Sequence, residues 1–483
     1  MKAPVLKTGK GAICYYENVK WHKKTWRIAL LIAIGAVVFQ VAASVPILRG
    51  LVILPLAISF YLATQYSPRK SSFVGFVFGF LLFAPQLYWF YNIFEYFAFA
   101  LWAIFAIWIA LWFYAVAVLY TLKSLSLKQR QLLGCFFAAI IWFGVEYLRS
   151  EYFYLRFSWL TTGYIVGPQP LSPFVGVYGW SFLLMFGAAI AVKFKTKVVL
   201  PILTIISVGL LAPWMDFSSI EVSNDDAPLI IGIQYEFEDE LVIRHGLDAA
   251  LEQYPEVDLI VLSEYAFYLP PSWMPQWCDE NDVHVMAGTV TLTDDIKRYF
   301  NSVIVWDPNG DLIFNQAKSQ PVQFVESCIP ANKQNVWESP WGKIGVGICF
   351  DSSYRRIMDS LVEQGAELIV IPAMDPVYWG AYEHELDARV CPIRAAEYGV
   401  PFVRVCSSGI SQSIQAGGRE VSTVPMPGQG EFLISRLNMK SGSVPVDVYF
   451  AFPSAGLFLL LIVIGIAKEI GTLFYRDKLP CET

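Results

Sequence analysis

Long apolar runs restrict the fold of this chain more than any other feature of its sequence. They extend from about Trp26 to Trp214 and from about Tyr449 to Phe474, whereas residues 215–448 resemble a soluble globular segment. A helix of about 20 apolar residues is long enough to cross the hydrocarbon core of a bilayer. The composition agrees, because 55% of the 483 residues are hydrophobic and 16% are aromatic, which is too apolar for an ordinary soluble protein.

We predict eight membrane spans within these runs. They are residues 26–44, 46–64, 73–92, 97–121, 131–148, 174–192, 198–214 and 450–470. The first is expected to stay in the membrane, because another span follows it where a cleaved signal peptide would give way to soluble chain. We therefore expect three parts, which are residues 1–214 with seven spans, an extracytoplasmic domain at 215–448, and residues 449–483 with the eighth span and a cytoplasmic tail.

Basic residues in the connections set the expected orientation. The N-terminal tail holds six lysines, and the second, fourth and sixth connections carry Lys or Arg, whereas the third has Glu95 and no basic residue. Positive charge is enriched in the cytoplasmic loops of membrane proteins. The N-terminus is therefore expected in the cytoplasm, and the domain that follows seven crossings is expected outside it.

Charge, cysteines and histidines exclude some classes of function. A net charge of −6 argues against nucleic acid as a partner, since phosphates attract basic surfaces. The eight cysteines show no CxxC spacing and the four histidines form no cluster, so we expect no metal site. Five of the cysteines lie in the outer domain, so at least one of these thiols stays unpaired within the domain even if disulfides form.

In the outer domain, short β-branched runs alternate with amphipathic helical stretches. The predicted strands are Pro228–Gln234, Leu259–Glu264, His284–Leu292, Ser302–Trp306, Leu312–Phe314, Lys343–Cys349, Leu368–Ala373, Val400–Ser407 and Phe432–Ser435. Helical periodicity occurs in Leu247–Tyr254, Ser272–Asp282, Ser353–Gly365 and Tyr382–Tyr398. This alternation predicts a layered α/β domain with mixed sheets.

Three predicted strands end at chemically useful side chains. Glu264 ends one strand, Lys318 follows a second, and Cys349 ends a third beside an expected helix start, which favours a thiolate. Each alone is commonly a solvated charge or a small buried hydrophobe. Functional groups of layered α/β folds gather at strand ends, so together the three make a candidate catalytic set.

The chemistry of such a set is consistent with nucleophilic catalysis. Glu264 would accept the thiol proton, Lys318 would stabilise the thiolate and then an oxyanion, and Cys349 would carry an acyl group as a thioester. A Cys–His mechanism fits poorly, because none of the four histidines lies in a matching strand-end context.

The order and spacing of these residues resemble the Glu-Lys-Cys triad of the nitrilase superfamily, which sits in an αββα sandwich. Eight spans with such a domain between the seventh and the eighth resemble the apolipoprotein N-acyltransferase family, over essentially the whole chain. Its lysine is followed by Phe after six residues and by Glu after eight, as Lys318 is by Phe324 and Glu326. The resemblance implies that Glu326 is a fourth active-site residue, orienting Lys318 or the attacked carbonyl.

Other segments carry the resemblance further, with departures near the triad. Similar segments are Gly144–Arg149, Trp159–Tyr164, Asn301-Ser302, Asp375–Gly380, Arg394–Pro401 and Ser407–Ser411. This chain departs from the usual motifs of the family at three places. The family has Trp-Pro-Glu where this chain has Leu262-Ser263-Glu264, and Leu-Val-Pro-Phe-Gly-Glu where it has Pro321-Val-Gln-Phe-Val-Glu326. The family has Cys-Tyr-Glu where this chain has Cys349-Phe350-Asp351. Asp351 therefore either does the work of the missing glutamate or caps the helix that follows.

Aromatic loops bracket the expected site. Tyr265–Trp273 follows Glu264, and Pro376–Tyr382 contains Tyr378 and Trp379. Single aromatics here are explained by core packing, but as a group they would guide acyl chains or enter the outer leaflet.

We assign expected substrate contacts to Asp351, Tyr378, Trp379 and Phe324. The aromatic stretch Phe157–Pro173 lies either at the membrane interface or against the outer domain, and both readings stay open.

The resemblance implies a cofactor-free N-acyltransferase of the bacterial inner membrane, monomeric and with its catalytic domain in the periplasm. Cys349 would take an acyl chain from a phospholipid and pass it to the N-terminal amine of diacylglyceryl-cysteine in a lipoprotein. A membrane-tethered amidase using water and an N-acyltransferase for another amine remain alternatives. A transporter or scaffold is disfavoured by the nearly charge-free spans.

Overall fold

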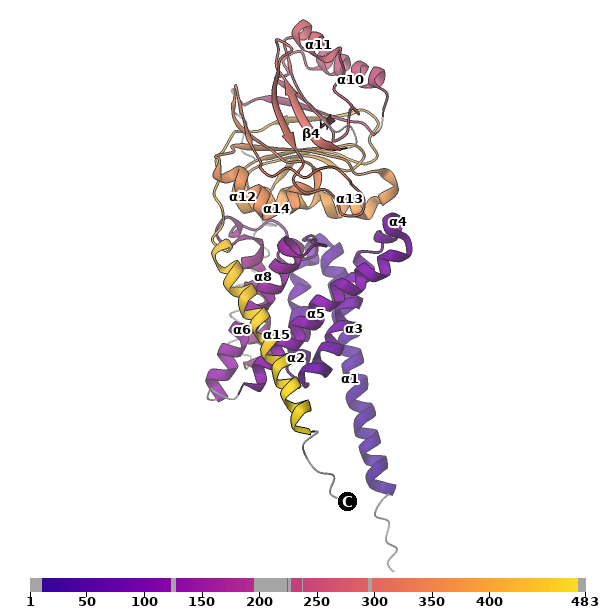
Figure 1. Ribbon diagram of the computed structural model, residues 1–483, viewed down its shortest axis with the longest axis vertical. Coiled ribbons are helices and arrows are strands. Elements are labelled where there is room, and N and C mark those ends of the chain that lie inside the picture. The colour runs from indigo at the N-terminus through magenta and orange to yellow at the C-terminus, as the bar shows by residue number, and fades with distance from the viewer. Residues whose placement is uncertain are drawn as a thin grey trace, which may run out of the picture.

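Apolar helices form one half of the molecule, and two packed β-sheets with their helices form the other (Figure 1). The computed structural model describes residues 11–122, 127–194, 224, 227–236, 238–293 and 298–476. The first and last long helices, α1 (Gly11–Ser44) and α15 (Val448–Arg476), both extend away from the sheets. The sheets therefore stand at one end of the helical bundle.

The bundle contains long helices joined by short ones. Besides α1 and α15, its elements are η1 (Pro46–Val52), α2 (Ile53–Ala63), α3 (Pro68–Gln86), α4 (Phe90–Phe94), η2 (Glu95–Phe97), α5 (Ala98–Thr121), α6 (Leu127–Tyr147), η3 (Leu148–Tyr152), α7 (Thr162–Val166) and α8 (Ser172–Lys193). Six segments of the described chain are apolar and long enough to cross a bilayer: Thr25–Ser44, Pro46–Ala63, Phe90–Thr121, Gln131–Tyr152, Ser172–Lys193 and Val448–Gly471. They coincide with six of the eight predicted spans.

The count of eight spans is not confirmed. The third predicted span, 73–92, corresponds largely to α3, whose first turn holds Arg69 and Lys70 and which is not among the six apolar segments. The seventh predicted span, 198–214, lies outside the described residues, as does the predicted boundary between residues 214 and 215.

Two glycines let α3 and α5 pack closely. A Cβ added at Gly75 would lie 2.6 Å from the ring of Phe113, and one added at Gly79 would lie 2.8 Å from Cβ of Ile109. Small residues at such contacts favour helix association in a membrane, where packing replaces the hydrophobic effect as the main attraction.

The outer half is built on two six-stranded mixed sheets. The first has the order β12 (Glu431–Arg436), β1 (Leu229–Gln234), β2 (Leu259–Leu262), β3 (His284–Leu292), β4 (Tyr299–Trp306) and β5 (Leu312–Ala317). The second has the order β11 (Glu420–Val424), β10 (Ser411–Ile414), β9 (Phe402–Cys406), β8 (Leu368–Ala373), β7 (Gly342–Val346) and β6 (Val336–Ser339). Strands β1 to β3 are parallel in the first sheet, and β7 to β9 are parallel in the second.

All nine predicted strands are present with boundaries shifted by a few residues, and the predicted mixed sheets are confirmed. Strands β6, β10 and β11 were not predicted. The helix predicted at Tyr382–Tyr398 is divided at Arg389 into α13 (Ala381–Ala388) and α14 (Val390–Tyr398).

Helices cover the outward face of each sheet, which gives four layers. The first sheet packs its apolar side chains against α10 (Glu240–Gln253) and α11 (Met274–Asn281). The second sheet is covered by α12 (Arg355–Glu363), α13 and α14, and these three lie between the sheets and the bundle (Figure 1). The largest hydrophobic cluster continues from this sheet into the membrane helices, so the two halves share one core.

Buried charges also join the halves. Arg355 of α12 lies 2.5 Å from Asp447, just before α15, and 3.3 Å from Glu397 of α14. Glu397 accepts a hydrogen bond of 2.8 Å from the backbone N–H of Val177 in α8, and Asp447 accepts one of 3.2 Å from that of Tyr178. The start of α8 is therefore held by carboxylates of the outer half.

Candidate active site

The three predicted strand ends come close to one another: Lys318 pairs directly with Glu264, and the charges of both act on the Cys349 thiol. Glu264 follows β2 and Lys318 follows β5, both in the first sheet, whereas Cys349 follows β7 of the second sheet and begins the short helix η5 (Cys349–Ser353). All three are buried, with Glu264 and Lys318 at 2% and 1% exposure. The pairing of the two sheets therefore brings together residues that are up to 85 positions apart in the sequence.

Lys318 lies between two carboxylates. Its Nζ is 2.7 Å from Oε1 of Glu264 and 2.8 Å from Oε2 of Glu326. Asn301 Nδ2 donates to both carboxylates, at 2.5 Å and 3.0 Å, and the backbone N–H of Met374 donates to Oε2 of Glu264 at 2.9 Å. Each group is thus fixed by hydrogen bonds in addition to the ion pairs.

The two carboxyls differ in their affinity for a proton. Burial raises the pKa of Glu264 to about 7, although the Lys318 ammonium opposes this rise. Burial also disfavours the charged form of Glu326, but the Lys318 ammonium outweighs it and lowers the pKa of Glu326. Glu264 is therefore suited to exchange a proton near neutral pH, while Glu326 stays anionic and helps to hold the lysine.

Cys349 is held in an unusual backbone conformation. Its φ is +49°, in the left-handed region that side chains other than glycine rarely adopt. Burial raises the pKa of its thiol well above the usual value, the Glu264 charge raises it further, and the Lys318 ammonium opposes both. Burial and the Glu264 charge therefore act against the thiolate that a helix start was expected to favour, and the Lys318 ammonium acts for it.

Asp351 ties the cysteine turn to the lysine loop. Its carboxylate accepts backbone hydrogen bonds from Gln320 at 2.7 Å, from Ile348 at 3.1 Å and from Ser319 at 3.2 Å. The side chain is fully buried and is not part of the cavity wall described below. This geometry argues against the expected substrate contact and favours the reading in which Asp351 caps the turn after Cys349.

A mainly apolar cavity of about 90 Å³, open to solvent at its mouth, reaches Cys349 from the membrane half. Its wall contains Trp89, Phe90, Ile93, Phe94, Leu101, Phe105, Leu155, Arg156, Phe157, Trp159, Val322, Gln323, Phe324, Cys349, Phe350, Asp375, Trp379, Glu383 and Asp387. Phe324 and Trp379 thus lie where a substrate would contact them. Tyr378 packs edge-to-face on Trp379, is 63% exposed and does not line the cavity.

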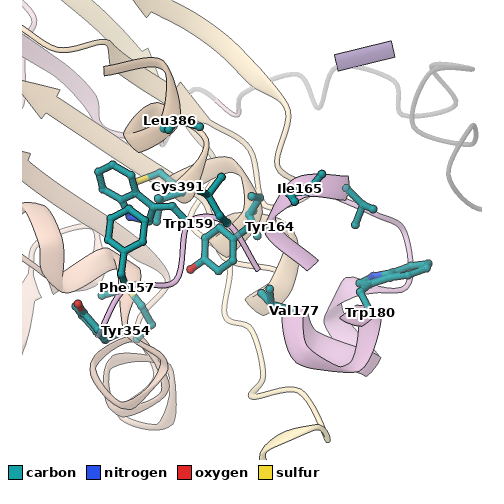
Figure 2. Packing of buried hydrophobic residues seen from close by; sticks show 14 of the residues in the cluster. Phe157, Trp159, Tyr164, Ile165, Val177, Trp180, Tyr354, Leu386 and Cys391 are labelled. Atoms are coloured by element: carbon teal, nitrogen blue, oxygen red, sulfur yellow. The ribbon is translucent and has the colours of Figure 1, made fainter. Parts of the chain in front are cut away.

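The aromatic stretch after α6 is buried against the outer half, which decides between its two readings. Figure 2 shows Phe157, Trp159 and Tyr164 beside Tyr354, Leu386 and Cys391 of the outer half. Trp159 Nε1 donates to Oγ of Ser353 at 2.8 Å, and Ser158 Oγ donates to the Ser353 carbonyl at 3.2 Å. This stretch therefore fixes η5 from the membrane side and supplies part of the cavity wall.

Sequence reasoning missed several polar residues of this region. Tyr265 is predicted only as one aromatic of a loop, but its hydroxyl donates to Oε1 of Glu326 at 3.1 Å. Glu383 and Asp387 fall within the predicted helix Tyr382–Tyr398 with no expected role at the site, yet both are buried and line the cavity. Helical spacing identifies which residues share a face, but it does not identify what covers that face.

Two family models match the chain. The model described as Apolipoprotein N-acyltransferase N-terminal domain matches residues 34–190, and the model described as Carbon-nitrogen hydrolase matches residues 242–423. The first match covers most of the helical bundle, and the second covers most of the sandwich with Glu264, Lys318, Glu326 and Cys349.

Curated relatives match most of the chain at low identity. The Apolipoprotein N-acyltransferase of Azotobacter vinelandii is 24% identical over 89% of this chain and 93% of its own length, and that of Geobacter metallireducens is 23% identical over 74% and 80%. The match to the protein of that name from Bdellovibrio bacteriovorus spans about half of each chain, at 21% identity. Among solved structures, the carbon-nitrogen hydrolase from Helicobacter pylori G27 superposes with a TM-score of 0.39 and 17% identity, covering 44% of this chain and 89% of that chain.

Proposed function

This chain belongs to the apolipoprotein N-acyltransferase family within the nitrilase superfamily, and from that membership we propose how its residues perform lipoprotein N-acylation. The acyl donor is a phospholipid of the surrounding bilayer. The acceptor is the N-terminal amine of a diacylglyceryl-cysteine in an apolipoprotein. The reaction needs no cofactor, because Cys349 itself carries the acyl group between the two substrates.

In the first step the thiol of Cys349 attacks the ester carbonyl of the phospholipid. The thiol proton passes to Glu264, an S–C bond forms, and the negative charge that develops on the carbonyl oxygen is stabilised by the Lys318 ammonium. The C–O bond then breaks, and Glu264 returns the proton to the departing glycerol oxygen. The products are a lysophospholipid and an acyl thioester on Cys349.

In the second step the acceptor amine attacks the thioester. A C–N bond forms and the C–S bond breaks, while Glu264 takes a proton from the attacking nitrogen and gives it to the departing sulfur. Glu326 and Asn301 keep Lys318 and Glu264 in place through both steps, since each hydrogen-bonds to this pair. Asp351 acts as a positioning residue for the turn that carries the thiol.

One observation supports this proposal above the others. Cys349 lies on the wall of a cavity lined mainly by aromatic side chains of the membrane half. The charges of Glu264 and Lys318 also act on the pKa of its thiol. We expect the acyl chains of a phospholipid to enter this apolar cavity from the bilayer. The ester group that joins such a chain to glycerol would then lie beside the Cys349 thiol, close to the buried charges. Phe324 and Trp379 are the proposed chain-contacting residues of the outer half.

The proposed setting is a bacterial inner membrane. The relatives are bacterial proteins, and six described segments are apolar and long enough to span a bilayer. We propose that the sandwich lies in the periplasm, because the lysine-rich N-terminal tail favours a cytoplasmic N-terminus. We also propose that the chain consists of a membrane part at residues 1–214, a catalytic domain at 215–448, and a last span with a cytoplasmic tail at 449–483.

Intact-protein mass spectrometry tests the thioester. Purified protein incubated with phospholipid micelles should gain the mass of one acyl chain, and hydroxylamine should remove it. Cys349→Ala should gain nothing, whereas Cys278→Ala, which changes a thiol in the separate core beneath α10 and α11, should behave as wild type. An adduct that persists in Cys349→Ala would refute the assignment, and release of free fatty acid without transfer to a lipopeptide would indicate an amidase-like hydrolase.

A further inference from the structure

Three buried carboxyls line the same cavity as Cys349. They are Asp375, which follows β8, and Glu383 and Asp387 of α13. None is more than 4% exposed. Glu383 and Asp387 are four residues apart, so α13 presents two like charges on one face, an arrangement that weakens a helix unless something else stabilises it.

One guanidinium pairs with two of the three carboxyls. Arg404 of β9 donates from Nη2 to Asp375 at 2.6 Å and also pairs with Asp387. If all three carboxyls were ionised, the group would carry two more negative charges than positive ones. Uncompensated charges of this kind are costly in a buried position unless a cation or a proton neutralises them.

Glu383 is the member without a partner. Neither of its carboxyl oxygens has a hydrogen-bond donor within the part of the chain that the structure describes. The ring of His384 comes to 3.5 Å from Oε2 of Glu383, but the same ring nitrogen lies 3.1 Å from the carbonyl oxygen of Pro376. A buried carboxyl on a cavity wall with two unused oxygens is thus ready for donors that an occupant of the cavity would bring.

Electrostatics around Glu383 agree with the geometry. Burial raises the pKa of Glu383 well above its usual value, the charges of Asp375 and Asp387 raise it further, and the Arg404 guanidinium opposes them. Burial likewise raises the pKa of Asp387 to about 7. These surroundings favour a protonated Glu383, and a cation placed beside it would reverse this preference.

We propose that Glu383, together with Asp375 and Asp387, forms a subsite that binds a primary ammonium group of a substrate. An ammonium carries the positive charge that the three carboxyls lack and three N–H donors for the unused oxygens. The inference rests on the proposed acyl transfer and assigns one further group to it. Two substrates offer such an ammonium: the N-terminus of the acceptor, and the headgroup of a donor such as phosphatidylethanolamine.

Proton balance gives this subsite a chemical role if the ammonium belongs to the acceptor. An ammonium, R–NH₃⁺, must lose one proton before its nitrogen can attack the thioester. Glu264 moves the second proton from nitrogen to sulfur, so the first needs a different base. Glu383, held as a carboxylate by the ammonium beside it, would take that first proton and release it to solvent after the amide has left.

The half-reactions of Glu383→Gln test the subsite, with Glu385→Gln on the exposed face of the same helix as control. With phosphatidylglycerol, which has no ammonium, Glu383→Gln should form the thioester within threefold of the wild-type rate. Transfer to a diacylglyceryl-cysteine lipopeptide should fall at least tenfold at pH 7 and recover as pH rises. Discharge to hydroxylamine, a mostly neutral nucleophile at this pH, should change less than threefold.

Other results separate the sources of the ammonium. If Glu383→Gln instead loses thioester formation with phosphatidylethanolamine but not with phosphatidylglycerol, the bound group is the donor headgroup. If every half-reaction proceeds at the wild-type rate, the subsite does not exist. A loss that is equal for lipopeptide and hydroxylamine would indicate a general defect and would also overturn the proposal.

Binding without chemistry tests the subsite even if no acyl transfer occurs. In Cys349→Ala protein, decylammonium should raise the midpoint of thermal unfolding more than decanol does. The difference should disappear in Cys349→Ala/Glu383→Gln and remain in Cys349→Ala/Glu385→Gln. Equal shifts in all three proteins would overturn the ammonium subsite, whereas absence of a thioester in the wild type would overturn only the proposed reaction.

Discussion

At the scale of single residues, the site depends on one lysine. Lys318 is 1% exposed and is the cation that contacts both Glu264 and Glu326, so its removal leaves two buried carboxyls facing each other. Breaking such a pair by removing one partner costs about 3–5 kcal/mol. The loss of an oxyanion-stabilising group costs about 10²–10³-fold in rate.

We expect Lys318→Met to reduce thioester formation by at least about 10²-fold and to lower the free energy of unfolding by about 3 kcal/mol. Mass spectrometry of the adduct and denaturant unfolding in detergent measure the two effects. The control is Lys343→Met, because Lys343 is partly exposed and its ion pair with Glu338 is at the surface, where such pairs contribute about 0–1 kcal/mol. A Lys318→Met protein as active as this control would contradict the assigned role.

The second residue-scale prediction concerns pH. The pKa of Glu264 is raised to about 7 by burial, and the base must be ionised to accept the thiol proton. Below that pH Glu264 is protonated and cannot act as a base. The rate of thioester formation should therefore rise about tenfold for each pH unit between 5 and 6.5 and level off above about 7.5.

Single-turnover rates with phosphatidylglycerol vesicles measure this profile, because that donor carries no ammonium to titrate. Glu264→Gln should be inactive at every pH. A wild-type profile that is flat from pH 5 to pH 8 would show that no group with the pKa of Glu264 gates the step.

At the scale of elements, the sequence predicted strand positions well because β-branched runs carry a period-two signal that is local. The three missed strands are short: β10 begins Ser411-Gln-Ser, and β6 and β11 are the two edge strands of the second sheet. The strand ends at Glu264, Lys318 and Cys349 were predictable for the same reason. Their joining was not, because it depends on how two sheets face each other, and only the resemblance supplied that information.

The sequence also could not decide what Asp351 does, because its partners are backbone N–H groups of two separate segments and the side-chain amide of Gln334, which only the fold brings together. The structure makes Asp351 the link between the lysine loop and the cysteine turn. Replacing it should therefore disturb the alignment of the reacting groups without changing how strongly a lipid binds in the cavity.

We expect Asp351→Asn to lower kcat by about 10- to 100-fold while KM for phospholipid stays within about threefold, since misplacing a reacting group by about 1 Å has costs of this order. Steady-state kinetics over a range of phospholipid concentrations separate the two parameters. Glu338→Gln, a change at an exposed strand position, serves as control. A rise in KM with unchanged kcat would instead restore the predicted substrate contact.

At the scale of the whole molecule, the two halves have to stay in register, because the cavity wall comes from both. Leu101 and Phe105 come from the bundle, whereas Phe324, Cys349 and Trp379 come from the sandwich. The shared hydrophobic core supplies most of the attraction. Hydrophobic packing is not directional, so the orientation of the halves needs specific contacts such as those made by Arg355.

Arg355→Met tests this requirement. The substitution keeps an apolar stem of similar length but leaves the buried Asp447 without its cation, whereas Glu397 keeps its ion pair with Arg394; the loss should cost about 3–5 kcal/mol of stability. Because these carboxylates also hold the start of α8, the bundle and the sandwich should loosen against each other before either unfolds. Limited proteolysis in detergent should then cut near Asp447 at least tenfold faster than in the wild type.

The control is Arg356→Met, at the exposed neighbouring position, which should be digested at the wild-type rate. If Arg355→Met shows wild-type digestion and stability, the register between the halves must come from apolar packing alone, and the cavity should then tolerate changes anywhere in the buried charge network.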